Sequence, residues 1–105
     1  DAARIDWTRD AAAIDRAVRA FDPWPAAWTT LGDTPVKVWH AHPRPGTVPA
    51  GTAPGTIVGV DAAGIDVACA SGVLRIETLQ PANARRMAAA AFAAGRALAP
   101  GTRFA

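Results

Sequence analysis

The sequence predicts a mainly β protein: a small antiparallel β-barrel with one helix near its N-terminus and a shorter helix near its C-terminus. Two observations lead to this prediction. Five short stretches between residues 27 and 80 alternate apolar and polar side chains, with turn-forming residues between them. Runs with helical spacing precede and follow them, at residues 8–21 and 87–95. A chain of 105 residues can bury one core, so we expect a single domain, residues 1–105.

Residues 8–21 predict the first helix. Thr8 is placed to act as its N-cap, and Asp10 falls in the first turn, where a negative charge suits the helix dipole. Apolar residues recur on one face of this helix: Ile14, Val18 and Phe21. Pro23 is expected to end the helix, because the residue before a proline is driven out of the α region.

The period changes to two after Pro25, which predicts a hairpin of residues 27–31 and 36–42 that turns at Gly32-Asp33. Alternation gives the second strand one face that carries Lys37, Trp39 and Ala41. The other face of that strand is expected to carry Val36, Val38, His40 and His42. Residues 42–55 contain four prolines and three glycines, so we expect a loop there.

Three more strands are predicted, at residues 56–60, 65–70 and 73–80. A loop follows at residues 80–86, and then an alanine-rich helix that Gly95 is placed to stop. Five antiparallel strands of this length usually close on themselves, because an open sheet would leave exposed edges. The expected fold is therefore a five-stranded barrel of the OB kind.

No catalytic constellation is found in the sequence. His40 and His42 lie two apart on one strand, but no Cys, Asp or Glu is near enough to complete a metal site, so we expect no metal. The single cysteine, Cys69, stands among small apolar residues and is expected to be a buried hydrophobe. One cysteine fits a reducing cytoplasm, and no apolar run is long enough to span a bilayer. We therefore expect a cytoplasmic domain that is not itself an enzyme.

The charge distribution points to a possible binding face. Residues 1–33 contain six Asp and four Arg, a net charge of −2, whereas residues 34–105 carry +4. The basic residues of the second part are interleaved with Trp39, Phe92 and Phe104. Basic side chains on a small barrel can bind a nucleic-acid backbone without reading its sequence. An ordinary solvated surface is the alternative interpretation.

A series of motifs in fixed order resembles a known family. The motifs are RIDW, RAFDPWPAAWT, TPVKVWHA, APGTI, GVLRIETLQPA, RRM and PGTRF. From about Arg4 to Phe104, the chain resembles the C-terminal domain of the methionyl-tRNA formyltransferases. Related C-terminal domains occur in sugar-nucleotide formyltransferases and formyltetrahydrofolate dehydrogenase, and a structural domain of that kind is the alternative. The KVW strand, the LQPA and RRM segments and the PGTRF ending favour the tRNA-acting branch.

The resemblance implies an OB-like barrel joined to an N-terminal Rossmann-type domain that binds 10-formyltetrahydrofolate. That domain holds the catalytic residues of the family, none of which is in this sequence, so no cofactor is expected here. The C-terminal domain is implied to bind the methionyl-initiator tRNA, largely through the RNA backbone. The residues expected to contact tRNA are Lys37, His40, Arg44, Arg75, Arg85 and Arg86. The expected partners are this tRNA and the N-terminal formyltransferase domain of the same chain, in a monomer.

The sequence departs from the family pattern at two positions, and one aromatic segment has an expected structural role. His40 follows KVW where a lysine or arginine is common, and Ala88 stands where a serine often opens the last helix. Three aromatic residues are expected to plug one end of the barrel: Phe21, Trp24 and Trp28. A stacking platform for bases is the alternative role for them. An independent single-strand binder is disfavoured, since the core then claims most of the tryptophans that it needs for stacking.

Overall fold

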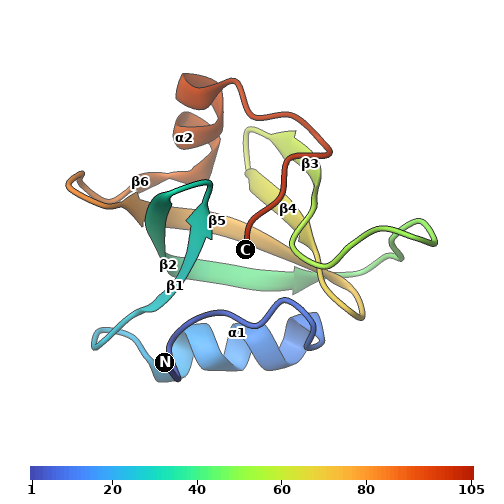
Figure 1. The fold of residues 1–105 in the computed structure, drawn as a ribbon, viewed down its shortest axis with the longest axis horizontal. Helices are drawn as coiled ribbons and strands as arrows, with labels where there is room; N and C mark the ends of the chain where they lie inside the picture. The colour runs from blue at the N-terminus through green and yellow to red at the C-terminus, as the bar shows by residue number, and fades with distance from the viewer.

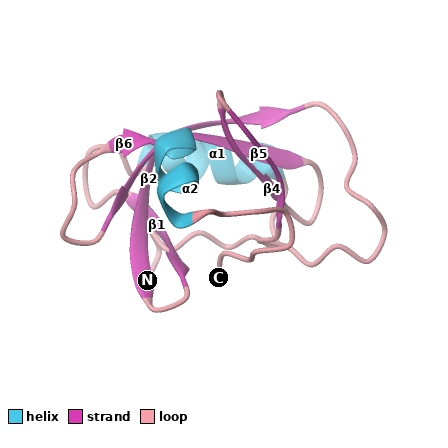
Figure 2. Ribbon diagram, turned by 90° about the horizontal axis from the view of Figure 1, so that it is seen from above, coloured by secondary structure: helices cyan, strands magenta, loops and turns pink.

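Six antiparallel strands form one strongly bent sheet with a helix on either side of it (Figure 1). The computed structural model describes all of residues 1–105. The elements in chain order are α1 (Ala11–Ala20), β1 (Ala27–Leu31), β2 (Thr34–Arg44), β3 (Ile57–Asp61), β4 (Gly64–Ala68), β5 (Val73–Pro81), β6 (Met87–Ala88) and α2 (Ala89–Arg96). Seen from above, α2 lies in front of the strands and α1 lies behind them (Figure 2). Neither helix is long and apolar enough to cross a membrane.

The strands lie in the order β1-β2-β5-β4-β3, and β6 pairs with β5. The two outer strands of this path, β1 and β3, do not pair with each other. Instead, the C-terminal segment bridges them: Phe104 pairs with Leu31, and Arg103 pairs with Thr56, the residue before β3. The mainly β, OB-like fold predicted from the sequence is confirmed, although the sheet itself stays open and has six strands rather than five.

The first helix begins later than predicted. Its N-cap is Asp10, whose carboxylate accepts a hydrogen bond from the Ala13 N–H at 2.6 Å. Thr8 instead bonds to Asp6, so its predicted capping role is wrong. The Ala11 N–H, which α1 leaves without an intrahelical acceptor, donates to the Ser71 carbonyl. A contact with a distant residue therefore helps to decide where the helix begins.

A β-bulge in β2 overturns the predicted faces of that strand. Val38 pairs with Leu79 and His40 pairs with Thr78, so Trp39, which lies between them, has no paired residue on β5. An extra residue of this kind shifts the alternation by one position. His40 is consequently exposed, so the prediction that it shares a face with the buried Val38 is wrong.

The last helix runs past the residue predicted to stop it. Helix α2 includes Gly95 and ends at Arg96, and its C-cap residue Ala97 adopts the left-handed conformation with φ of 51°. The Leu98 N–H then donates to the Ala93 carbonyl, as in a common helix C-cap. At the other end, Ala88 provides no side-chain cap, as its place in the motif predicted.

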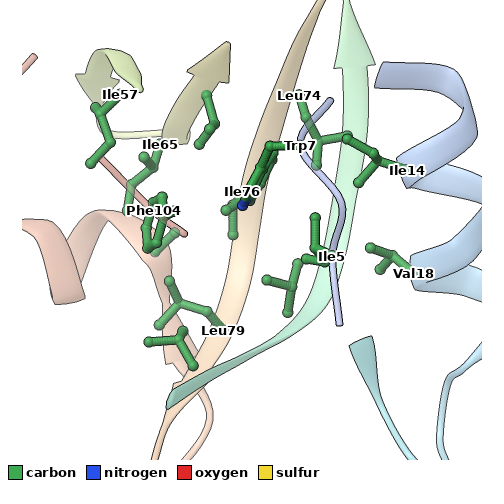
Figure 3. Packing of buried hydrophobic residues seen from close by; sticks show 14 of the residues in the cluster. Ile5, Trp7, Ile14, Val18, Ile57, Ile65, Leu74, Ile76, Leu79 and Phe104 are labelled. Atoms are coloured by element: carbon green, nitrogen blue, oxygen red, sulfur yellow. The ribbon is translucent and has the colours of Figure 1, made fainter. Parts of the chain in front are cut away.

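The aromatic residues at the centre of the core are Trp7 and Phe104 rather than the predicted trio. Their rings stack with centroids 6.1 Å apart, and they are 4% and 1% exposed (Figure 3). The Trp7 indole N–H donates to the buried Thr29 hydroxyl, which in turn donates to the Ala105 carbonyl. The prediction that Trp24 plugs the barrel is wrong, because this residue is 82% exposed.

The C-terminal segment passes so close to one loop that only glycine fits there. Gly55 has φ of 92°, and a Cβ at this position would lie 2.3 Å from the Phe104 carbonyl oxygen. The Phe104 N–H donates to the Gly55 carbonyl at 2.8 Å. Gly55 thus allows the backbone approach that seats Phe104 in the core.

Candidate nucleic-acid interface

Four residues from four neighbouring segments form a row across the outside of the sheet. Trp28 of β1 pairs with Lys37 of β2, and Lys37 pairs in turn with Gln80 of β5. Arg4 extends the row through a parallel bridge to Trp28. Paired residues point to the same side of a sheet. The residues next to them along the strands, Ala27, Val38 and Leu79, are buried, so the row points outward.

Aromatic rings hold the cations of this row. The Arg4 Cζ lies 5.0 Å from the centroid of the Trp28 ring. Next to the row, the Arg86 Cζ lies 3.6 Å from the centroid of the Trp39 ring, and the Lys37 Nζ lies 6.0 Å from it. A ring face attracts a cation without neutralising it, so these groups keep their full charge. We call the row and its neighbours the basic face: Arg4, Trp28, Lys37, Trp39, Gln80, Arg85 and Arg86.

Gln80 connects the basic face to the loop of residues 82–86. The Trp39 indole N–H donates to the Gln80 side-chain oxygen at 3.0 Å. The Gln80 amide nitrogen donates to the Ala84 carbonyl at 2.9 Å. The carbonyl it binds belongs to the residue directly before Arg85 and Arg86, so Gln80 fixes the backbone that presents both guanidinium groups.

No lysine or arginine of the basic face forms an ion pair, although the Asp1 carboxylate accepts a hydrogen bond from the Trp28 indole at the edge of the face. The ion pairs of the structure involve Arg19, His42, Arg44 and Arg75, and none involves Arg4, Lys37, Arg85 or Arg86. A hollow of about 140 Å³ lies beside Lys37 and Gln80. It is smaller than the ~300 Å³ of ordinary small-molecule sites. The face is therefore better suited to the surface of a polyanion than to a small ligand.

A second group of arginines lies elsewhere on the same sheet and has a different environment. The Arg75 guanidinium donates to Asp66 at 2.8 Å and to Asp61 at 2.9 Å. The Arg44 guanidinium donates to the other oxygen of Asp66, also at 2.8 Å. The Arg75 side chain is only 11% exposed. We call these four residues the carboxylate cluster: Arg44, Asp61, Asp66 and Arg75.

Hydrogen bonds stabilise the charged forms within the carboxylate cluster. The bond to Asp66 is the main reason why the pKa of Arg75 is raised above its ordinary value. The Ala63 backbone N–H, together with Arg75, lowers the pKa of Asp61. Two arginines and two aspartates carry no net charge, so this cluster serves to join β2, β3, β4 and β5.

The structure divides the residues predicted to bind tRNA between these two places. Lys37, Arg85 and Arg86 belong to the basic face, whereas Arg44 and Arg75 are paired with carboxylates. Both guanidinium groups are already paired with carboxylates, and the Arg75 side chain is only 11% exposed, so Arg44 and Arg75 are left out of the candidate interface. His40 is exposed on β2, beyond the bulge.

Three residues of the basic face, Arg4, Trp28 and Gln80, were not among the residues expected from the sequence to contact tRNA. The alternation in β1, in which Ala27 is buried, could have placed Trp28 on the outer face. No local signal places Arg4, because its position depends on the pairing of the N-terminal segment with β1. Phe92 and Phe104, which were expected to lie among the basic side chains, are buried in the core instead.

The remaining candidate residues, Cys69 and His42, lie in environments that are typical of structural roles. Cys69 is buried, and burial raises the pKa of its thiol to about 11, as a small buried hydrophobe would show. His42 lies 3.0 Å from an exposed carboxylate, that of Glu77. No three His, Cys, Asp or Glu side chains gather in an arrangement that could hold a metal ion.

The comparisons with known proteins agree with the motifs in the sequence. The family model described as "Formyl transferase, C-terminal domain" matches residues 1–97. A methionyl-tRNA formyltransferase of Thiobacillus denitrificans is 50% identical over 101 residues, which are 96% of this chain and 32% of that protein. The methionyl-tRNA formyltransferase of Neisseria meningitidis is 46% identical, with the same coverage of both chains. The chain thus spans about a third of the length of these curated relatives.

The solved structures support the fold alone. HypX from Aquifex aeolicus in complex with tetrahydrofolic acid has a TM-score of 0.71 and 19% identity, over 87% of this chain and 16% of that one. A variant of the same protein has a TM-score of 0.73 and 18% identity, over 90% and 17%. This sheet and its two helices therefore also occur as a small part of a much longer protein.

Proposed function

The chain belongs to the formyl transferase C-terminal domain family, and we propose that it is the tRNA-binding domain of a methionyl-tRNA formyltransferase. The observation that carries this proposal is the basic face. Arg4, Lys37 and Arg86 lie on the outer side of the sheet, Arg85 is next to Arg86 in the chain, and none of the four forms an ion pair. The two curated relatives, at 50% and 46% identity over nearly the whole chain, support the choice of the tRNA-acting branch.

The proposed role is electrostatic. Arg4, Lys37, Arg85 and Arg86 contact phosphates of the methionyl-initiator tRNA, and His40 lies near enough along β2 to add a contact. Phosphate contacts fix position and orientation without reading sequence. The domain thus holds the tRNA while the aminoacylated acceptor end of the tRNA reaches another part of the protein.

The chemistry is assigned outside this chain. In the proposed full-length cytoplasmic enzyme, a preceding domain binds 10-formyltetrahydrofolate and transfers its formyl group to the amino group of the methionyl-tRNA. No residue of the 105 is assigned to that transfer or to the formyl donor. The domain contributes affinity and orientation, and by itself it is not an enzyme.

A salt series tests the electrostatic role. If about four phosphates are neutralised, the logarithm of the association constant falls with the logarithm of salt concentration at a slope of roughly −3 to −4. Filter binding of this chain to initiator tRNA measures the slope. A response that does not depend on salt would overturn the mechanism.

A competition experiment separates this role from a structural one. A structural C-terminal domain of a sugar-nucleotide formyltransferase or a formyltetrahydrofolate dehydrogenase would bind tRNA no better than any polyanion. We expect heparin to displace the tRNA only when the concentration of heparin anionic groups is well above the concentration of tRNA phosphates. Equal competition by heparin would favour the structural role.

A further inference from the structure

Trp24 is the one tryptophan whose side chain makes no aromatic stacking, cation–π or hydrogen-bond contact. It is 82% exposed, whereas Trp7 stacks on Phe104 in the core. Trp28 is covered by Arg4, and Trp39 is covered by Arg86. A large aromatic residue in this position leaves apolar surface in water, and exposed tryptophans are frequent energetic centres of protein interfaces.

The loop that carries Trp24 has a defined conformation. It closes through a hydrogen bond from the Ala26 N–H to the Phe21 carbonyl at 2.9 Å. Proline stands on each side of the tryptophan, at positions 23 and 25, and both prolines are exposed. Because each proline fixes its own φ and restricts the residue before it, the backbone around Trp24 has little freedom and loses little entropy on binding.

The loop lies beside the segment through which the chain enters the domain. The Trp28 N–H donates to the Ala3 carbonyl, and the Ile5 N–H donates to the Trp28 carbonyl. The Trp28 indole also donates to the Asp1 carboxylate at 3.1 Å. The first five residues therefore run along the start of β1, only a few residues after Trp24, and Figure 1 shows the N-terminus and this loop at the same end of α1.

The charge around Trp24 disfavours RNA as the occupant. No lysine or arginine occurs between residues 20 and 36, and the loop itself contains Asp22. A nucleotide stacked on this indole would find no cation within the loop for its phosphate. The other candidate is polypeptide: the matching family is a C-terminal domain, and the curated relatives extend over about three times the length of this chain.

We propose that Trp24, with Pro23, Pro25 and the half-buried Phe21, forms the surface on which the preceding domain of the full-length chain docks. The indole inserts into an apolar recess of that domain, and the two prolines pack against its rim. This contact sets the orientation of the basic face relative to the preceding domain. It uses none of the residues assigned to tRNA.

The test compares two variants of the full-length protein, Trp24→Ala and Val60→Ala. Val60 is the other exposed large hydrophobic residue of this domain, so it is a matched control. We expect Trp24→Ala to increase the rate of limited proteolysis between the domains at least 5-fold and to increase the radius of gyration measured by X-ray scattering. Val60→Ala should change neither, and Trp24→Phe should give an intermediate result.

Binding of initiator tRNA to the 105-residue chain provides the second measurement. We expect Trp24→Ala to leave this affinity within about 2-fold and the melting temperature unchanged, because the side chain makes no internal contact that the fold needs. The proposal would be overturned if full-length Trp24→Ala had the same proteolysis rate and the same radius of gyration as the wild-type protein. It would also be overturned if the full-length protein had no domain before this one. A large loss of tRNA affinity in the short chain would assign Trp24 to RNA instead. Salt-independent tRNA binding together with domains that separate in Trp24→Ala would reject the proposed function and keep this inference.

Discussion

The basic face and the carboxylate cluster use the same kind of side chain in opposite ways. In the cluster, Arg75 is 11% exposed and donates three hydrogen bonds to two aspartates. On the basic face, Arg86 is exposed and its guanidinium lies over the Trp39 ring, with Cζ 3.6 Å from the ring centroid. Both guanidinium groups are ordered by their neighbours, but only the first is neutralised.

The difference shows what makes an arginine available to a polyanion. Carboxylates match the guanidinium geometry and remove its charge, so an arginine paired with them stabilises the fold. An aromatic ring restrains the same group through its face and leaves the N–H donors at the edge free. Basic composition alone does not distinguish these cases, whereas the partner of each cation does.

The largest expected effect comes from reversing the charge of the loop in the basic face. The double variant Arg85→Glu/Arg86→Glu removes two of the proposed phosphate contacts and adds two repulsive charges. We expect tRNA affinity to fall about 100-fold at low salt, and for all tRNAs alike, as measured by filter binding. The matched control is Arg9→Glu/Arg16→Glu, which makes the same change at exposed positions before and within α1.

The control variant should lose no more than about 3-fold in affinity. Equal losses in the two double variants would show that only net charge matters and that the basic face is not a site. A loss confined to initiator tRNA would show that the loop reads sequence.

The carboxylate cluster should respond in stability rather than in binding. Replacing Arg75 by methionine leaves Asp66 and Asp61 without their main cation, so we expect the melting temperature to fall by roughly 5–10 °C. Affinity for tRNA, measured well below that temperature, should remain within about 2-fold. Weakened binding in a variant that melts normally would return Arg75 to the interface.

Replacing Gln80 tests whether the basic face needs a fixed loop. Gln80→Leu removes the hydrogen bonds to Trp39 and Ala84 but changes no charge. We expect tRNA affinity to fall about 5-fold, because Arg85 and Arg86 must then be ordered on binding. Hydrogen exchange at residues 82–86 should become faster, and unchanged exchange together with weaker binding would point to a direct contact from Gln80.

The smallest expected effect is a gain in stability beside the basic face. Ala88 has the extended conformation of an N-cap but no side-chain acceptor. Ala88→Ser supplies one, so we expect about 0.5 kcal/mol of added stability by chemical denaturation, without a change in tRNA affinity. A gain in affinity would mean that order in α2, rather than charge, limits binding.

The local patterns were sufficient for most of the secondary structure. The two-residue period and the turn residues gave β1, β3 and β5 within about one residue, because neighbouring side chains fix both signals. The errors fall where a distant segment intervenes. The bulge at Trp39 follows from pairing with β5, and the core position of Phe104 follows from the tail that crosses between β1 and β3.

The same division applies to the candidate site. The sequence predicted Lys37, Arg85 and Arg86, because their basic character is local and they flank strand or loop positions. It also assigned Arg44 and Arg75 to this set, since nothing near either residue in the chain reveals Asp66. It missed Arg4, whose place on the face depends on a bridge to Trp28, a residue 24 positions later.

The amino-acid sequence by itself determined five of the six strands, the two helices, the family and the supply of positive charge. The tertiary structure decided which cations remain free, which tryptophan stays in water and which aromatic rings fill the core. The physical reason is one of range: backbone period and turn chemistry act over a few residues, whereas neutralisation and burial depend on groups that strand pairing brings together from distant parts of the chain.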